Sequence, residues 1–184
     1  ALLGSSAALV HTPAAMVAIT VPLALIPVTA TLNVVGPPVT AAFVAPAVAA
    51  LLLVVHFVVM GEGVRELRFI AGLTLVGVCI DQLLFRVGVF TVAGSIAGPP
   101  LWITCLWPAL GTTFMHAFAG LSGKPLLAAI VGGVGGAASY IAGTRLTQVS
   151  FAADISGPII LAVLWAVIFP VALAIANRKD SGPA

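Results

Sequence analysis

Asp81 is the residue whose type and position point most directly to chemistry. It lies well inside the long apolar segment 64–90, and an ionised carboxylate in the hydrocarbon of a membrane is costly unless it is neutralised or paired. Arg86 follows at i+5, about 140° around a helix, so Arg145 on another apolar segment is the expected partner. Two hypotheses follow: a buried ion pair that fixes the helix register, or a proton or substrate site.

A larger intramembrane polar site would join Asp81 to other polar residues. Gln82 and Arg86 are four residues apart and therefore share one face of a helix. Together with Arg145 and His116, they could line the polar cavity of a small transporter or lipid-handling protein. This hypothesis requires that the five side chains converge on one water-accessible pocket.

Two histidines, His56 and His116, lie a few residues inside apolar segments near the same expected membrane face. A neutral imidazole donates one hydrogen bond and accepts another, so hydrogen-bonded packing between helices is the first interpretation. The alternatives are a proton relay and axial ligation of haem or chlorophyll. The sequence requires no cofactor, and no Cys-x-x-Cys or His-rich spacing predicts a metal site.

The aromatic residues divide by depth. Trp102 and Trp107 lie near the start of one apolar segment and fit an interfacial aromatic belt on the outer side of the membrane. Trp165 and Tyr140 lie deeper, where their N–H and O–H groups need hydrogen-bond partners. None of the four belongs to a recognisable cofactor motif.

Small residues recur at helical spacing in a glycine-rich segment. Gly132 and Gly136 form a GxxxG pair, and Gly135, Ser139 and Gly143 continue a second stripe at i+4 spacing. Such residues let a neighbouring helix backbone come close, which is a main source of helix affinity in lipid. The segment is not a phosphate loop, because no Gly-Lys-Ser/Thr follows. The partner helix belongs either to this chain or to another protein.

The elements that position these residues are long apolar segments. Of the 184 residues, 61% are hydrophobic, seven are Lys or Arg and five are Asp or Glu, whereas about a quarter of the residues of a soluble domain are charged. A membrane-spanning helix needs about 20 mainly apolar residues. We therefore expect one integral membrane domain over residues 1–184, with an all-α fold. This composition excludes a soluble catalytic domain, a nucleic-acid-binding protein and a disulfide scaffold.

Prolines mark the starts of five of the predicted spans, because proline is tolerated in the first turn of a helix, and Gly61-Glu62-Gly63 precedes the span that begins at residue 64. We predict a polytopic transmembrane helix bundle of about six spans joined by short loops. The predicted spans cover residues 14–35, 39–60, 64–90, 101–121, 126–147 and 159–177. The stretches 88–98 and 148–157, which are rich in glycine and polar residues, are expected to be loops.

The basic residues separate into two sets when six spans are threaded through a membrane. The larger set is Arg65, Arg68, Lys124, Arg178 and Lys179, and the smaller set is Arg86 and Arg145. Lys and Arg accumulate on the cytoplasmic side of membrane proteins. We therefore expect both termini on the cytoplasmic side of a bacterial inner membrane, or on the equivalent side of an organelle membrane.

Several runs of residues in the second half of the chain carry a resemblance to a known family. They are Pro100-Leu101-Trp102-Ile103-Thr104-Cys105-Leu106-Trp107, Thr112-Thr113-Phe114-Met115-His116, Lys124-Pro125-Leu126-Leu127-Ala128-Ala129, Gly132-Gly133-Val134-Gly135-Gly136 and Tyr140-Ile141-Ala142-Gly143. Over residues 64–177 the chain resembles the domain-of-unknown-function 2878 family of small bacterial inner-membrane proteins. The resemblance implies a compact multi-helix membrane protein, with Asp81, His116 and Arg145 as family positions. It implies no activity.

The leading functional hypothesis is a non-enzymatic accessory or assembly subunit that packs through its glycine face within a larger membrane complex. It follows from the short loops and from the lack of a Ser-His-Asp set or a pair of neighbouring acidic residues. The expected partners are membrane lipids and other membrane protein subunits, and not nucleic acid. The alternatives are the small transporter or lipid-handling protein described above and a pigment- or haem-ligating subunit of a photosynthetic or respiratory complex.

Overall fold

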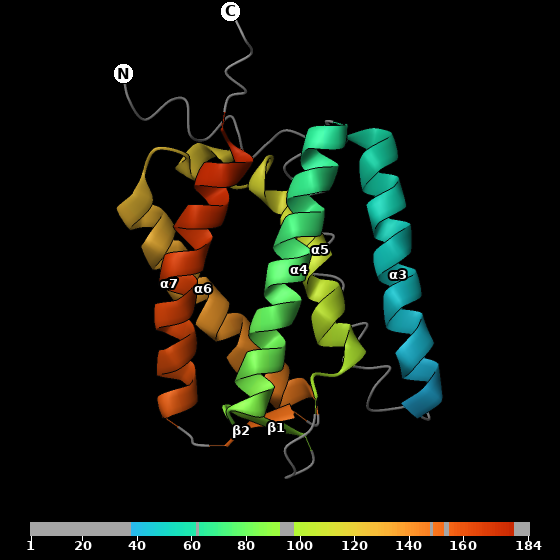
Figure 1. Cartoon of the computed structure of the whole chain (residues 1–184), viewed down its shortest axis with the longest axis vertical. Helices are drawn as coiled ribbons and strands as arrows, with labels where there is room; N and C mark the ends of the chain where they lie inside the picture. The colour runs from blue at the N-terminus through green and yellow to red at the C-terminus, as the bar shows by residue number, and fades with distance from the viewer. Residues whose placement is uncertain (1–37, 62, 93–97, 148, 153–154, 179–184) are drawn as a thin grey trace, which may run out of the picture.

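The computed structural model is a bundle of helices with one small sheet (Figure 1). It describes residues 38–61, 63–92, 98–147, 149–152 and 155–178. The first predicted span, 14–35, lies outside the described residues. The all-α prediction is confirmed for the bulk of the described chain.

The helices run in alternating directions along the bundle. Their bounds are α3 Pro38–Val59, α4 Val64–Arg86, α5 Leu101–Phe114, α6 Pro125–Leu146 and α7 Ser156–Ala176, with a 3-10 turn, η1, at Ala119–Leu121. All five starts agree with the predicted spans to within three residues, and α5 ends earlier than the predicted residue 121. Helix α6 packs mainly against α7, whereas α5 packs against α3 and α4.

Helix α4 ends before the predicted residue 90 because of Gly88. This glycine has a φ of 75°, a left-handed conformation that favours glycine. The N–H of Gly88 donates to the carbonyl of Phe85, and the N–H of Val89 donates to the carbonyl of Leu84. This pair of hydrogen bonds is the Schellman motif, which closes the carbonyl end of a helix.

A single buried stripe runs along α4. Its residues are spaced by three or four, as expected for one face of an α-helix. They are Glu66, Ile70, Leu73, Gly77, Asp81 and Leu84. The stripe that forms part of the core therefore also carries two carboxylates.

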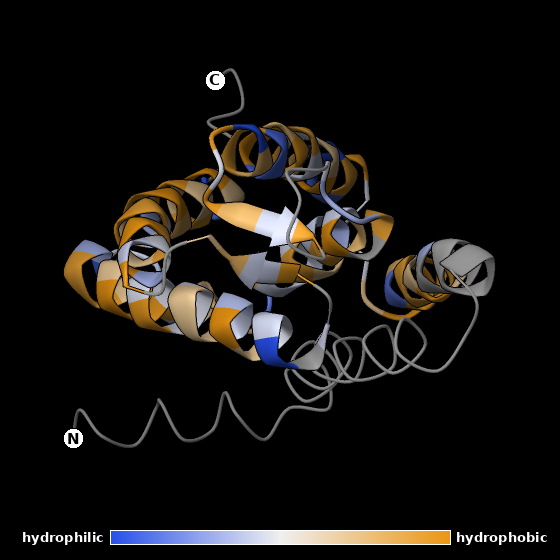
Figure 2. Cartoon of the chain, turned by 90° about the horizontal axis from the view of Figure 1, so that it is seen from below, coloured by the Kyte–Doolittle hydropathy of each residue, from blue (hydrophilic) through white to orange (hydrophobic). Residues whose placement is uncertain are grey.

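Three helices of the described chain are long and apolar enough to cross a membrane: Val64–Arg86, Pro125–Arg145 and Ser156–Ala176. Large apolar side chains such as Leu75, Val134 and Val163 are exposed, and Figure 2 shows hydrophobic colour over much of the helical ribbons. These features indicate a membrane protein. Helix α5, with 14 residues, is shorter than the predicted span, and the count of six spans stays a prediction.

A two-stranded antiparallel sheet joins two segments that were expected to be loops. Strand β1 (Phe90–Val92) pairs with β2 (Val149–Phe151), with Thr91 opposite Ser150. The hydroxyl oxygens of this pair lie 3.0 Å apart. The loop prediction is therefore wrong for these strands. Figure 2, which views this end of the bundle, shows the strands between the helices.

The bundle has two chemically different ends. At the end opposite the sheet, Arg65 at the start of α4 donates to the carbonyl oxygen of Arg178 after α7 at 2.9 Å. Asn177 donates to the carbonyl of Phe114 at the end of α5 at 3.4 Å, so three helix ends meet there (Figure 1). We refer to this end of the bundle as the basic end and to the end that carries β1 and β2 as the sheet end. The basic end holds Arg65, Arg68, Lys124 and Arg178, and the sheet end holds Arg86 and Arg145.

Candidate functional site

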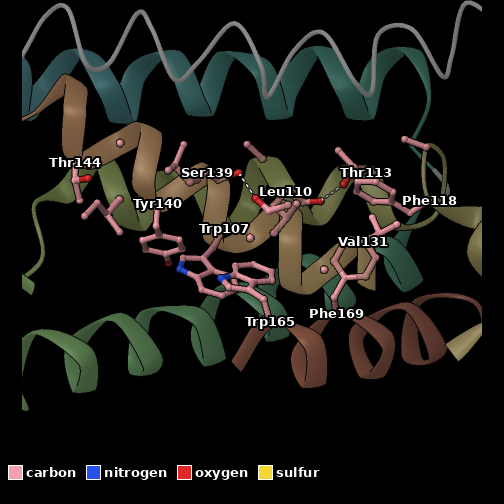
Figure 3. Close-up of a pocket in the computed structure, with 18 of the residues that line it drawn as sticks. Trp107, Leu110, Thr113, Phe118, Val131, Ser139, Tyr140, Thr144, Trp165 and Phe169 are labelled. Atoms are coloured by element: carbon pink, nitrogen blue, oxygen red, sulfur yellow. Dashed lines mark hydrogen bonds between the residues drawn. The ribbon is translucent and has the colours of Figure 1, made fainter. Parts of the chain in front are cut away.

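A cavity of about 480 Å³ lies between α5 and α6 and is bounded by Trp165 and Phe169 of α7 (Figure 3). This volume falls within the range of about 300–1,000 Å³ that is usual for ligand pockets. The lining residues on α6 extend from Val131 to Thr144, which corresponds to about 20 Å along the helix axis. The cavity is therefore elongated, and it is parallel to a candidate membrane span.

Small residues of α6 form one wall of the cavity. Gly135, Ser139 and Gly143, the second stripe noted in the sequence, all line it. A Cβ added to Gly135 would meet no atom within 4 Å, and both Gly135 and Ser139 are exposed. The cavity is therefore open on this side, at the middle of α6.

The hydroxyl groups of the wall do not make the cavity polar. Ser139 donates to the carbonyl of Gly135 at 2.8 Å, and Thr113 donates to the carbonyl of Leu110 at 2.6 Å (Figure 3). Thr144 donates to the carbonyl of Ile141 at 2.8 Å. Because these hydroxyl protons are used within the wall's own helices, the surface offered to a ligand is mainly apolar.

Asp81 lies behind the cavity wall and is fully buried. The indole Nε1 of Trp107 donates to its Oδ2 at 2.6 Å, and the hydroxyl of Tyr140 donates to its Oδ1 at 2.8 Å. One carboxylate of α4 thus holds aromatic side chains from α5 and α6. Hydrogen bonds to an ionised acceptor are stronger than those between neutral groups.

The two aromatic donors present ring surface to the cavity. Trp107 stacks on Trp165, with ring centroids 5.2 Å apart and planes 11° apart (Figure 3). Tyr140 stacks on Phe90, with centroids 5.4 Å apart. Trp107 and Tyr140 both line the cavity while their polar atoms bind Asp81. Asp81 is therefore a positioning residue for the cavity wall.

The other polar residues predicted near Asp81 lie elsewhere. Gln82, Arg86 and Arg145 are exposed, whereas Asp81 is fully buried. The expected ion pair of Asp81 with Arg145 is not present in the described part of the chain, because two neutral donors bind the carboxylate instead. Trp107, assigned to an interfacial belt from the sequence, is one of these donors and is buried.

His116 belongs to a second polar cluster at the basic end. Its Nε2 lies 3.0 Å from Oε1 of Glu66, and Nε2 of His56 lies 2.8 Å from the same oxygen. Glu66 is fully buried and His56 is 5% exposed. The sequence identified both histidines but not Glu66, since a carboxylate in the first turn of a span looks like a solvated helix end.

The two clusters are separate, although one helix carries the carboxylate of each. Glu66 and Asp81 are 15 residues apart on α4, or about 22 Å along its axis. The structure therefore does not bring His116 together with Asp81, Gln82, Arg86 and Arg145 in one pocket. It places an apolar cavity beside Asp81 and a His–Glu–His cluster at the opposite end.

The glycine-rich segment of α6 packs closely against α7. A Cβ on Gly132 would overlap the side chain of Phe169, and one on Gly136 would overlap the indole of Trp165. These two glycines therefore lie against α7 of the same chain. Gly135 faces open space instead.

Comparison with known proteins gives one family. The family model described as "Protein of unknown function (DUF2878)" matches residues 31–171. This confirms the resemblance and extends it toward the N-terminus. No curated protein and no solved structure matches the chain.

Proposed function

Since the chain belongs to the DUF2878 family of proteins of unknown function, we propose its function from its own geometry: it binds the hydrocarbon chain of a lipid in the cavity between α5 and α6. The observation that carries the proposal is the elongated cavity itself, of about 480 Å³. Its wall combines aromatic rings with small residues, and its hydroxyl groups point into their own helices. Such a surface suits a long apolar molecule.

The position of the opening supports a ligand that comes from the bilayer. Gly135 and Ser139 lie at the middle of α6, within the candidate span Pro125–Arg145, and both are exposed. The side of a span that is embedded in a membrane faces lipid chains and not water. An apolar chain can therefore enter sideways without crossing water.

A polar substrate is less well supported by the same wall. A polar group that is buried without a hydrogen-bond partner costs about 1–3 kcal/mol in proteins. The polar atoms of Trp107 and Tyr140 are directed at Asp81, so they are not offered to a ligand. This favours lipid handling over the transport of ions or sugars.

The other functional hypotheses have less support in the geometry. The accessory-subunit role relied on a glycine face, but Gly132 and Gly136 lie against α7. Axial ligation of haem or chlorophyll needs a ring nitrogen directed at the pigment, whereas Nε2 of His56 and of His116 bind Glu66. Both roles stay predictions.

We also propose that the basic end faces the cytoplasm, or the equivalent compartment of an organelle. Of the Lys and Arg residues in the described chain, four lie at the basic end and two at the sheet end. Positive charge on short loops and helix ends sets the orientation of membrane proteins. In this orientation the sheet lies at the opposite surface.

The lipid proposal is tested by quenching of tryptophan fluorescence with a brominated fatty acid. Trp107 and Trp165 are only 3% and 7% exposed, so surrounding detergent reaches them poorly, yet both line the cavity. The measurement uses purified full-length protein with Trp102→Phe. We expect saturable quenching that an unlabelled fatty acid reverses.

A matched pair of variants separates the cavity from the lipid-facing surface. Gly135→Phe places a ring in the cavity, whereas Val134→Phe places the same ring at the adjacent position, which is 68% exposed. We expect at least a tenfold loss of apparent affinity in Gly135→Phe and none in Val134→Phe. Quenching that is not saturable, or that is equal in both variants, would exclude the cavity as the binding site.

A further inference from the structure

We propose that His56, Glu66 and His116 form a binding site for a divalent transition-metal ion of the zinc class. The three residues come from the end of α3, the first turn of α4 and the segment after α5. Their possible ligand atoms all lie within 4.8 Å of one another. The site is at the basic end, remote from the opening of the cavity, and does not depend on the lipid proposal.

Two of the three distances between ligand atoms are already close to those of a metal site. Both imidazoles direct Nε2 at one carboxylate oxygen, at 2.8 Å and 3.0 Å. Zinc binds nitrogen and oxygen at about 2.0–2.2 Å, so two ligand atoms of a tetrahedral site lie about 3.3 Å apart. A shift of a few tenths of an ångström converts both nitrogen–oxygen distances into ligand spacings. The two nitrogens lie within 4.8 Å of each other and need a larger approach, of up to about 1.5 Å, to reach the same spacing.

The donor set selects the class of ion. Two imidazoles and one carboxylate are the ligands of several zinc sites that keep a fourth position for water. Imidazole also suits iron, copper and nickel, whereas magnesium and calcium prefer oxygen ligands alone. Without thiolate ligands in this cluster, soft monovalent copper is disfavoured.

The burial of the cluster provides a physical reason for a cation. Glu66 is fully buried and its two histidine partners carry side-chain exposures of 6% and 14%. A buried carboxylate is costly unless positive charge or strong hydrogen bonds compensate it. Hydrogen bonds from both histidines meet part of this cost, and a divalent ion would add positive charge beside the carboxylate. The partial exposure of His116 leaves a side from which the ion can reach the site.

Spacing in the sequence could not reveal this site. The ligands are 10 and 50 residues apart along the chain, unlike the short motifs by which metal sites are usually recognised. They meet because α3 and α5 pack together and α4 packs on α5.

The test measures binding of Zn²⁺ and Co²⁺ to full-length protein without a polyhistidine tag, after treatment with a chelator. We expect one ion per chain and a visible Co²⁺ spectrum of a low-coordinate nitrogen and oxygen site. Glu66→Gln and His116→Gln should each weaken binding by at least about 100-fold, because loss of a residue that only hydrogen-bonds to a metal ligand already costs about 10–100-fold. Gln82→Asn, at an exposed position near the sheet end of α4, is the control and should bind as the wild type does.

Each outcome decides the proposal. Wild-type protein without saturable binding would show that the cluster is a hydrogen-bonded contact only, as would ligand variants that bind normally. If Glu66→Gln fails to give a single peak on size-exclusion chromatography, His116→Gln, at the more exposed position, is compared with the wild type instead. If neither variant folds, the titration of the wild-type protein decides. Gly135→Phe should retain the metal and Glu66→Gln should retain the lipid probe, so the two proposals fail separately.

Discussion

The indole of Trp107 occupies the space that a Cβ on Gly77 would fill. From this position its Nε1 reaches Asp81, which lies one helical turn further along α4. A glycine on one helix thus determines how closely an aromatic residue of another helix approaches, and the same approach aligns the hydrogen bond to the carboxylate. The wall of the cavity depends on this contact.

The first prediction concerns Gly77→Ala. The added methyl group would overlap the Trp107 indole, and such overpacking costs about 1–3 kcal/mol. We expect a lower midpoint of thermal unfolding and altered tryptophan fluorescence. The control is Gly72→Ala on the same helix, where a Cβ would meet no atom within 4 Å and the gain in helix propensity is up to about 1 kcal/mol. Equal effects of the two substitutions would contradict the observed contact.

The second prediction concerns Asp81→Asn. An asparagine is uncharged and accepts through one oxygen only, so either the Trp107 indole loses its acceptor or the Tyr140 hydroxyl has to turn and accept from the NH₂ group. We expect a loss of about 1.5–3 kcal/mol, the value of a hydrogen bond to a charged group, measured by unfolding in detergent. Gln82→Asn, at the adjacent exposed position, should change the stability by less than about 0.5 kcal/mol.

The third prediction tests the link between Asp81 and Tyr140 directly. In a double-mutant cycle with Asp81→Asn and Tyr140→Phe, groups in one hydrogen-bonded network show coupling of about 0.5–3 kcal/mol. We expect a coupling in this range, because the Tyr140 hydroxyl lies 2.8 Å from the carboxylate. Strictly additive effects on unfolding would show that the two residues act independently.

The fourth prediction concerns the contact of α6 with α7. Gly136→Ala should destabilise the protein, since the new Cβ would overlap the Trp165 indole. Gly135→Ala, at the neighbouring position on another face of α6, should be tolerated because a Cβ there would meet no atom within 4 Å. Resistance to unfolding by SDS measures the difference. If Gly136→Ala unfolds at the same SDS concentration as the wild type, the close packing of these helices is not formed in the membrane protein.

The fifth prediction concerns orientation. Single cysteines replace Ser122, before α6 at the basic end, or Ser150 in β2, in a background with Cys79→Ala and Cys105→Ala; both serines are exposed. A membrane-impermeant maleimide should label Ser150→Cys from outside intact cells and Ser122→Cys only in inverted vesicles. The reverse pattern would place the basic end outside, and labelling of both from one side would contradict a spanning α6.

Much of the helical framework is predictable because hydrophobic length and proline positions act locally. The starts of α5 and α6 follow from prolines at or directly before them, and Gly88 signals the early end of α4. Strands β1 and β2 were not predictable in this way. Each has only three residues, too few for an alternating pattern to be detected, and they are paired by tertiary packing.

The candidate site was predictable in its residues but not in their partners. Asp81 stands out because a carboxylate in an apolar helix needs compensation. The choice of Trp107 and Tyr140 over Arg145 depends on how α5 and α6 rotate against α4, which one sequence does not specify. Glu66 was missed for the same reason, since only the approach of His56 and His116 marks it as buried.

The pairing of β1 with β2 also orders events during synthesis. Strand β1 leaves the ribosome before α5 and α6 are made, and β2 follows them, so β1 cannot pair with β2 until both helices have been made. Contacts between segments so distant in the chain form late, because the entropy of closing a long loop must first be overcome. Formation of the sheet is therefore a final step of assembly, and substitutions that weaken it should leave each helix formed while the completed bundle forms more slowly.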